Sequence, residues 1–429
     1  MHHSTQITRR RSRLTRMKRF LLPLATALVT LLLFAVLIEL FATAYLSVAD
    51  GRYVPARERF ASRTNLFMRD LVQERNTCGY MDTLYPHPYL GFVHHANRPC
   101  GLAEINNVGL FGTDFPFIRP EDRFVVLVTG GSVANQFAKG VSDGPSYLER
   151  FLNARYVSPT GKPFLVLNGG DGAWKQPQQA ILFLLFVDTV HGVVTLDGYN
   201  ERAPILSLEE RFEYPANNFH RANPAASQDP GDVLVRWILG RVRARAAANA
   251  VLSRSQAAYA VISAAEGWAE RQAEQRPKPR TSLESIFALP PGWTREQLRS
   301  WQLGLYRKYV RAMHVVARDH GVLEAHFIQP VPAISKPLTA DEEKVVGEFA
   351  YRDVYLQLTD SLMAMNADGV PVISLLDVFA SDRRTLYGDD IHLRQDAAGV
   401  SPGYERLADR IATDLAGLWH LRPRTSDAN

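Results

Sequence analysis

The sequence predicts an α/β fold in which five parallel strands form a sheet that helices cover on both faces. Short apolar runs alternate with helical patterns from residue 124 onward. A chain of 429 residues with 46% hydrophobic content can bury a core of that size. Glycine-rich or polar islands follow four of the predicted strands, and the carboxyl ends of parallel strands are where such folds bind ligands.

The predicted elements follow one another in strand–helix order. Strands are expected over 124–128, 164–167, 193–196, 325–328 and 370–375. Helices are expected over 145–156, 176–187, 294–320, 341–366 and 402–419. Ser401 suits the N-cap of the last helix, and Pro402 suits its first position.

The stretch from about 203 to 291 interrupts this alternation and indicates an insertion between the third and fourth strands. An alanine- and arginine-rich helical run covers 233–274, and a proline-containing linker over 275–280 ends it. We expect either a helical lid or a docking surface. Its arginines at positions 241, 243, 245 and 254 either face anionic glycan or lipid head groups or form a solvated helix face.

Residues 1–19 form a basic tail. Seven arginines and lysines lie between Arg9 and Arg19 with no acidic residue among them. The chain has 49 basic and 44 acidic residues, so without these seven the balance would be slightly negative. The formal net charge of +5 therefore reflects the tail, and we expect no nucleic-acid partner.

Residues 20–46 are predicted to form a transmembrane anchor. Residues 20–38 carry no charge, and the apolar character resumes after Glu39 and continues to Ala49. That length matches the ~20 residues that cross a bilayer and exceeds the ~7–15 residues of a signal-peptide core. The basic tail should stay cytoplasmic, so the main domain should lie on the far side. The alternative is a cleaved signal peptide, with Ser47-Val48-Ala49 as its small-residue site.

Residues 50–112 predict an irregular extracytoplasmic extension that holds the two cysteines of the chain. Cys78 and Cys100 either form one disulfide, the simplest state in an oxidising compartment, or remain two buried thiols. Histidines at positions 87, 94 and 95 match no zinc spacing, so surface or packing roles are expected. No metal is predicted, and the lack of a phosphate loop or dinucleotide fingerprint predicts no organic cofactor.

Three islands offer a nucleophile and the donors of an oxyanion hole. Ser132, in Gly130-Gly131-Ser132, follows the first strand, where its hydroxyl and backbone N–H can face the sheet edge. Gly172 follows the second strand and lets the backbone approach a substrate oxygen, because glycine has no Cβ. Asn200 follows the third strand and offers a side-chain N–H. Each island alone is more typical of a turn, but converging donors would stabilise an oxyanion.

A fourth island, Asp389-Asp390-Ile391-His392, follows the fifth strand and supplies an acid–base pair. Neutral His392 would take the proton of Ser132, and Asp389 would orient the ring and stabilise its charged form. Asp390 is an alternative partner for the histidine, although it points away if Asp389 faces inward.

The four islands, in this order and each after a strand, resemble the Ser, Gly, Asn and His blocks of the SGNH hydrolases, also called GDSL-type esterases. The resemblance covers roughly 111–421. It implies a flavodoxin-like three-layer αβα domain over 113–421 that contains the insertion, followed by a tail over 422–429. It also implies catalytic roles for Ser132, Asp389 and His392, with Ser132, Gly172 and Asn200 as the oxyanion hole.

The chain departs from the family pattern at supporting positions. Gly131 stands where the family usually has aspartate, and Glu201 stands where aspartate often follows the asparagine. Gly170 is an alternative to Gly172 as the glycine of the second block. The segments over 107–112 and 327–330 resemble those of membrane-anchored bacterial members, and the second of them makes Gln329 a candidate wall of the site.

The resemblance implies a single-pass inner-membrane protein with its main domain in the periplasm. Its expected activity is that of a serine esterase or O-acyltransferase acting on acyl esters, most simply acetyl esters, of cell-surface polysaccharide. A transferase would need a multi-span membrane partner to bring acyl groups across. One alternative is a non-catalytic assembly or binding component of a cell-envelope polysaccharide system. Another is a lipase or lysophospholipase.

Overall fold

The computed structural model describes residues 4–62, 84–94, 99–100, 103–142, 144–214, 230–275, 288–396 and 398–424. Its central sheet has five strands, β5 (Phe124–Gly130), β7 (Phe164–Gly170), β8 (Gly192–Asp197), β9 (Leu323–Ile328) and β10 (Val372–Ser374). They lie in the order β10-β9-β8-β5-β7, and each neighbouring pair is parallel. The first of these strands in sequence thus lies between the second and third, which is the flavodoxin-like order. The predicted fold class is confirmed.

The sheet domain also contains the helices α5 (Ser132–Ala138), α6 (Tyr147–Arg155), α7 (Gln178–Phe186), α8 (Arg202–Ser207), α13 (Arg295–Asp319), α14 (Ala340–Glu343), α15 (Arg352–Met363), η3 (Ala364–Asp368) and α16 (Pro402–Leu418). Four predicted helices correspond to α6, α7, α13 and α16. As predicted, Ser401 caps α16, because its Oγ accepts the N–H of Tyr404 at 3.2 Å. The short helices α5 and α8 were not predicted.

The prediction of one continuous helix over 341–366 is wrong. The chain leaves α14 after Glu343 and becomes helical again only at Arg352. Between them, Gly347 has a φ of +62°, a left-handed conformation that a right-handed helix does not contain. The apolar periodicity continues through the break, so the spacing alone did not reveal it.

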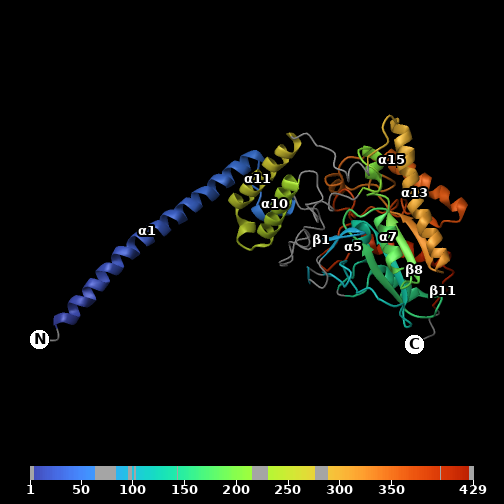
Figure 1. Cartoon of the computed structure of the whole chain (residues 1–429), viewed down its shortest axis with the longest axis horizontal. Helices are drawn as coiled ribbons and strands as arrows, with labels where there is room; N and C mark the ends of the chain where they lie inside the picture. The colour runs from blue at the N-terminus through green and yellow to red at the C-terminus, as the bar shows by residue number, and fades with distance from the viewer. Residues whose placement is uncertain are drawn as a thin grey trace.

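Helices cover both faces of the sheet (Figure 1). Every residue of β5 and of β8 is buried, the pattern of a parallel sheet enclosed between two layers. Val126 and Val128 pack in one core with residues of α5, α6 and α16. Val125 and Leu127 point to the other face and pack in a second core with residues of α7 and α13. The sheet is therefore the middle layer of three.

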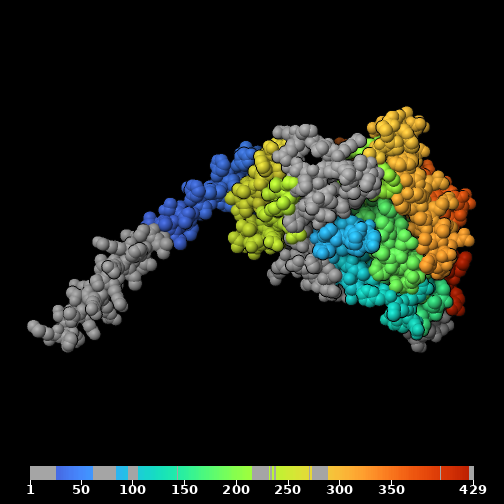
Figure 2. All heavy atoms as spheres, in the orientation of Figure 1, coloured from blue at the N-terminus to red at the C-terminus, as the bar shows by residue number. Residues whose placement is uncertain are grey.

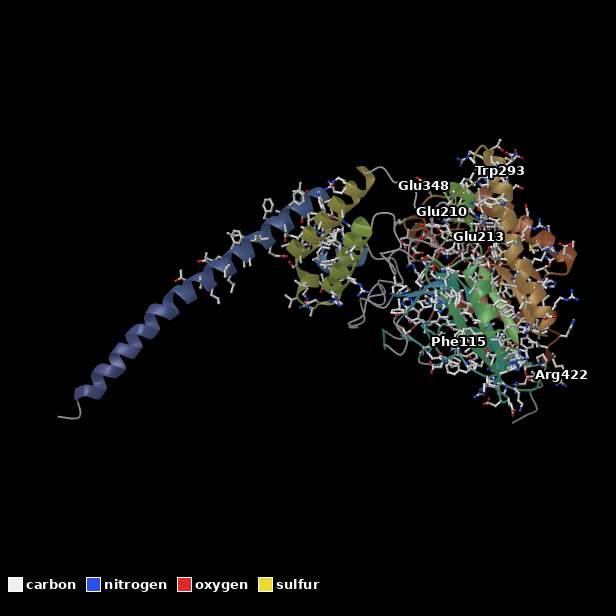
Figure 3. All side chains as sticks on the ribbon, viewed as in Figure 1. Phe115, Glu210, Glu213, Trp293, Glu348 and Arg422 are labelled. Carbon is white, nitrogen blue, oxygen red and sulfur yellow. The ribbon has the colours of Figure 1, made fainter. Side chains whose placement is uncertain are left out.

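The segment before the sheet packs into the second of these cores. It forms two antiparallel pairs, β1 (Leu84–His87) with β2 (Gly91–His94) and β3 (Pro99–Cys100) with β4 (Ala103–Glu104). Phe92 and Phe111 share the core with Leu127 of β5. Phe115, labelled in Figure 3, is 1% exposed and meets Phe186 edge to face, with ring centroids 4.8 Å apart. Side chains on both sides of residue 112 thus share one core.

Two predictions fall outside the described residues. Cys78 and the side chain of Cys100 lie there, so the disulfide stays a prediction. The side chains of the basic tail lie there as well. At the other end of the chain, β11 (Arg422–Pro423) pairs with β6 (Tyr156–Val157), which ties the C-terminal segment to the end of α6.

One long helix, α1 (Ser4–Ala49), leads into the molecule from the N-terminus (Figure 1). Its part from Thr26 to Ala49 has a mean hydropathy of 2.4 and is long enough to cross a membrane. Most of its large apolar side chains, among them Leu31 and Phe34, are exposed. An apolar helix at this position is either a signal sequence or an anchor.

The part of the insertion over 230–275 forms a helical hairpin beside the C-terminal end of α1 (Figure 2). It consists of α10 (Pro230–Ala248) and α11 (Gln256–Gln275), which are connected through η2 (Leu252–Arg254). α11 packs against α1, and both α10 and α11 contact α2 (Ala56–Ser62). Phe60, Ala246, Tyr259 and Ile262 form a small shared core, the hairpin core.

Candidate active site

The strand register brings three strand ends side by side. Gly130 of β5 lies beside Gly170 of β7 and beside Leu196 of β8. The islands that follow these strands therefore meet at one edge of the sheet, where the strand order reverses. Ser132 opens α5 there, directly after β5, and its side chain is half-buried.

Ser132, His392 and Asp389 form a hydrogen-bonded chain at this edge. Nε2 of His392 lies 2.6 Å from Oγ of Ser132, and Nδ1 lies 2.8 Å from Oδ2 of Asp389. In the neutral tautomer that donates Nδ1–H to Asp389, Nε2 can accept the serine proton. His392 is only 7% exposed. The distances are those of a nucleophile paired with an oriented base.

The loop after β10 is shaped locally so that Asp389 and His392 meet. Oδ1 of Asp389 accepts the backbone N–H of Ile391 at 2.9 Å and that of His392 at 2.6 Å. The N–H of Gly388 donates to the carbonyl of His392 at 2.8 Å and closes the turn. Burial raises the pKa of Asp389, but the hydrogen bond and charge of His392 outweigh it and hold that pKa below its ordinary value. The carboxylate is thus kept ionised beside the imidazole.

Asp390, the alternative partner for the histidine, has a different contact. Its Oδ2 accepts the hydroxyl of Tyr199 at 2.6 Å. The guanidinium carbon of Arg202 lies 3.6 Å from the centroid of the Tyr199 ring and 4.6 Å from that of Tyr351. This aromatic cluster borders the loop of Asp389. No local pattern in the sequence reveals this cluster, because Tyr351 is far from the other members along the chain.

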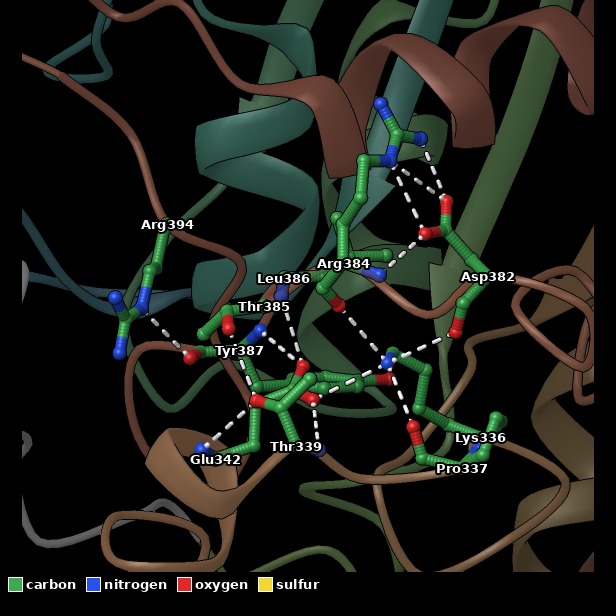
Figure 4. Close-up of polar contacts among 10 residues, drawn as sticks. All are labelled: Lys336, Pro337, Thr339, Glu342, Asp382, Arg384, Thr385, Leu386, Tyr387 and Arg394. Carbon is green, nitrogen blue, oxygen red and sulfur yellow. Dashed lines mark hydrogen bonds and ion pairs between the residues drawn. The ribbon is translucent and has the colours of Figure 1, made fainter.

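A buried ion pair holds the start of the same loop (Figure 4). Nζ of Lys336 lies 3.1 Å from Oε2 of Glu342, and their side chains are 1% and 0% exposed. Lys336 also donates to the carbonyls of Asp382 and Arg384, at 3.1 and 3.0 Å. Oε1 of Glu342 accepts the N–H of Leu386 at 2.8 Å and that of the next residue at 3.0 Å. These bonds anchor the segment that leads to Asp389.

Asn200 packs against the glycine that precedes the nucleophile. Its Nδ2 donates to the carbonyl of Trp174 at 2.8 Å, and a primary amide carries a second N–H. A Cβ added to Gly131 would lie 2.2 Å from that Nδ2. The aspartate that the SGNH family usually has at this position would therefore collide with Asn200. Glycine at 131 is what this arrangement requires.

Glu201 fixes the Asn200 loop from the interior. It is 1% exposed, and its carboxylate accepts the backbone N–H groups of Gly198 at 2.8 Å and Gln176 at 3.2 Å. Nε2 of Gln179 donates to it at 3.0 Å. Burial raises the pKa of Glu201 in spite of these hydrogen bonds. The residue that departs from the family pattern thus links the loops after β7 and β8.

In the loop after β7, the predicted oxyanion donor Gly172 has an internal hydrogen-bond partner. The N–H of Gly172 donates to Oδ1 of Asp171 at 2.6 Å, so this conformation does not offer it to a ligand. The same oxygen lies 3.2 Å from Nε2 of His94, and both side chains are buried. Ala173 has a φ of +63°, in the left-handed region that favours glycine. In the described part of the chain its N–H has no hydrogen-bond partner.

Gln329 lies just past β9 and is 3% exposed. Its N–H donates to the carbonyl of Asp197 at 2.9 Å, and its Nε2 has no hydrogen-bond partner among the described residues. Its role as a site wall stays a prediction. Within the ranges that the structure describes, no group of three or more His, Cys, Asp and Glu residues could hold a metal ion.

No protein-family model matches the chain, and no curated protein matches it. Among solved structures it is similar to a Bacteroides fragilis protein assigned as an acylhydrolase, with 10% identity, a TM-score of 0.31, and coverage of 70% of this chain and 91% of the other. It is also similar to an α/β-hydrolase enzyme from the metagenome of Lake Arreo, Spain, with 11% identity, a TM-score of 0.33, and coverage of 71% and 97%. At these TM-scores neither similarity carries an argument about function.

Proposed function

We propose that the chain is a serine ester hydrolase or acyltransferase of the SGNH type. The observation that carries this proposal is the hydrogen-bonded chain from Ser132 Oγ through the His392 ring to Asp389, with distances of 2.6 and 2.8 Å. The chain lies beyond the carboxyl ends of a flavodoxin-like sheet, where folds of this kind place their sites. Asn200 and the first N–H of α5 lie beside it as candidate donors.

The reaction would proceed in two steps. Ser132 Oγ attacks the ester carbonyl carbon while its proton moves to Nε2 of His392, and Asp389 stabilises the imidazolium. The N–H of Ser132, the free N–H of Asn200 and an amide of the loop after β7 would hold the oxyanion. That amide is either Gly172, after it releases Asp171, or Ala173. Collapse breaks the ester C–O bond, and the leaving alcohol takes the proton from His392.

The acyl group on Ser132 is then transferred to a second nucleophile. Water gives the free acid, whereas a sugar hydroxyl gives a new ester, and His392 takes the proton of either one. We propose acyl esters of cell-surface polysaccharide, most simply acetyl esters, as the substrates. A transferase would take its acyl group from a multi-span membrane partner, because one helix cannot carry acyl groups across a bilayer.

We further propose that α1 is a retained anchor in the inner membrane, with the sheet domain in the periplasm. The apolar part of α1, which the structure describes from Thr26 to Ala49, is long enough to span a bilayer. The hairpin of the insertion packs on the C-terminal part of that helix, including Glu39 and Leu46. Cleavage after Ala49 would remove these contacts, which supports retention over cleavage.

The test is labelling by a fluorophosphonate probe and turnover of p-nitrophenyl acetate by the full chain in detergent. Ser132→Ala and His392→Ala should abolish both signals, whereas Ser207→Ala, at an exposed serine, should leave them unchanged. Asp389→Asn should lower kcat by roughly 10⁴, as loss of the orienting carboxylate does in serine proteases. Asp390→Asn is the matched control and should retain most activity, because Asp390 bonds Tyr199 instead of the histidine.

A folded protein that neither labels nor turns over the ester, or one whose activity survives Ser132→Ala, would sink the proposal and favour a non-catalytic assembly component. If the ester is turned over, an acetylated glycan with and without an acceptor sugar separates hydrolase from transferase. Release of free acetate alone identifies a hydrolase, and acetate that appears on the acceptor identifies a transferase.

A further inference from the structure

Glu39, an acidic residue inside the apolar stretch of α1, binds the N-terminus of α11. Its carboxylate accepts the N–H of Gln256 at 2.5 Å, the N–H of Ala257 at 3.2 Å and the hydroxyl of Ser255 at 2.7 Å. The first N–H groups of a helix lack partners within the helix, and its dipole favours a negative charge there. A carboxylate in an apolar helix is costly unless it is paired. The contact therefore satisfies groups on both elements.

One stripe of α1 faces the hairpin, while the rest of the same turns stays apolar and exposed. Ala42 is buried and Leu46 packs against the hairpin core. They lie three and seven residues after Glu39, on one helical face. Elsewhere on these turns Phe41 is 74% exposed and Val48 is 83% exposed. On the turns where the hairpin packs, the other side of α1 is thus exposed and apolar and remains suited to contact with lipid.

This geometry sets the height of the hairpin relative to a membrane that α1 spans. A helix rises about 1.5 Å per residue, so the uncharged stretch over 20–38 spans roughly 28 Å, close to the ~30 Å of a hydrocarbon core. Glu39 then lies at the outer boundary of that core. Because α11 begins on Glu39, its first turn lies at the same level, where the hydrocarbon core meets the head groups.

The hairpin has an apolar groove suited to this level. The groove has a volume of about 590 Å³ and is lined by residues that include Val242, Ala246, Leu252 and Val261. Val261 is 69% exposed. Arg245 also lines the groove. Aliphatic side chains beside an arginine suit the level at which acyl chains meet anionic head groups.

We infer that the α10–α11 hairpin is a membrane-docking module. It lies at the outer boundary between the acyl chains and the head groups of the bilayer that α1 spans, Glu39 holds it on the anchor, and phospholipid acyl chains fill its groove. The inference rests on the anchor part of the proposed function and is independent of the chemistry at Ser132. It extends the docking-surface interpretation of the insertion by naming the surface that is bound.

The experiment places an environment-sensitive fluorescent amino acid at Val261 in the full chain. The protein is reconstituted into vesicles of phosphatidylethanolamine and phosphatidylglycerol that contain a shallow nitroxide-labelled lipid. The control is the same probe at Val315 of α13, which is 59% exposed on the sheet domain. We expect the nitroxide to quench the probe at Val261 at least threefold more than the probe at Val315. Equal quenching at the two positions would overturn the inference. Finding that the mature protein isolated from cells has lost α1 by cleavage would overturn it as well.

A second measurement tests the part played by Glu39. Glu39→Gln keeps the shape of the side chain and removes its charge, and Glu58→Gln, at an exposed position in α2, is the matched control. We expect Glu39→Gln alone to accelerate hydrogen exchange at the first amides of α11 about tenfold and to reduce quenching at Val261. Unchanged hydrogen exchange at these amides would refute the proposal that Glu39 holds the hairpin on α1. Esterase turnover, followed in the same vesicles, reports separately on the proposed function.

Discussion

At the scale of single residues, the glycine before the nucleophile determines where an oxyanion donor can lie. Gly131 leaves room for the amide of Asn200, whose Nδ2 would be 2.2 Å from any Cβ at that position. The same amide is held by the carbonyl of Trp174. The glycine that departs from the SGNH pattern is thus explained by the packing of a residue with a proposed catalytic role.

We predict that Gly131→Ala lowers kcat for p-nitrophenyl acetate by roughly 10²–10³, the usual effect of losing one oxyanion donor. The new methyl group meets the far end of a side chain, so Asn200 should move while the fold persists. Thermal unfolding followed by circular dichroism should show little change in Tm. Full activity in Gly131→Ala would mean that Asn200 does not contribute to the transition state.

Gly130→Ala provides the contrasting variant. Its Cβ would lie 2.2 Å from the backbone carbonyl oxygen of Leu196, which cannot move without displacing β8. We therefore expect this neighbouring substitution to lower Tm clearly. If both variants lost stability equally, the specific explanation for Gly131 would fail.

At the scale of elements, the loop between β10 and α16 has little regular structure and depends on polar contacts for its shape. The Lys336–Glu342 pair binds backbone groups of this loop between Asp382 and Tyr387 (Figure 4). Asp389 then organises the following turn through the N–H groups of residues 391 and 392. The segment over 382–387 is thus held by a buried charge pair, and the turn that follows it is held by the proposed catalytic carboxylate.

We predict that Lys336→Met lowers the free energy of unfolding by about 3–5 kcal/mol, because it leaves the charge of Glu342 buried without its partner. Turnover of p-nitrophenyl acetate should also fall, since the loop would no longer fix His392. Urea unfolding and initial-rate measurements provide the two readouts.

The matched control is Lys344→Met, which removes a lysine that pairs with Asp341 at 3.0 Å on the exposed surface. Exposed pairs of this kind contribute little to stability, so both readouts should stay at the wild-type level. An unchanged unfolding free energy in Lys336→Met would show that the buried pair does not hold the loop.

At the scale of the whole molecule, stability should depend on pH through a buried lysine between two loops. Nζ of Lys175 donates to the carbonyls of Phe212 at 2.6 Å and Tyr214 at 2.5 Å. Burial lowers the pKa of Lys175 to about 8, against the opposing charges of Glu201 and two other glutamates. The unfolded chain keeps the ordinary lysine pKa of about 10.4.

Between pH 8 and about 10.4 the unfolded state therefore binds a proton that the folded state has released, so stability from this group rises with pH. We predict that the difference in unfolding free energy between wild type and Lys175→Met shifts in favour of wild type by on the order of 3 kcal/mol across this window. Urea unfolding at several pH values measures it. The loss of two hydrogen bonds in the variant adds only a constant offset. A difference that does not change with pH would contradict the prediction.

The strands, the fold class and the meeting of Ser132, Asp389 and His392 could be predicted from the sequence. Both faces of a parallel strand are buried, so each strand is a continuous apolar run that can be recognised locally. Strand ends share one edge, so residues after different strands could be expected to meet. Ser132 and His392 do meet, although 260 residues separate them. The turn of Asp389 and His392 is local, and its three-residue spacing revealed it.

Only the tertiary structure decided the contacts that support the site and the position of the insertion. In the sequence Glu201 is only a departure from a pattern, because its partners at residues 176 and 179 lie in the loop after β7 and in the first turn of α7. The break at Gly347 has no signal in the apolar spacing. The contact of Glu39 with the first turn of α11 joins residues 217 positions apart, so no local pattern reveals it. The spacing of apolar residues along the sequence indicates which face of a helix or strand is buried. Which distant polar groups form hydrogen bonds with one another depends on how the elements pack in the folded chain.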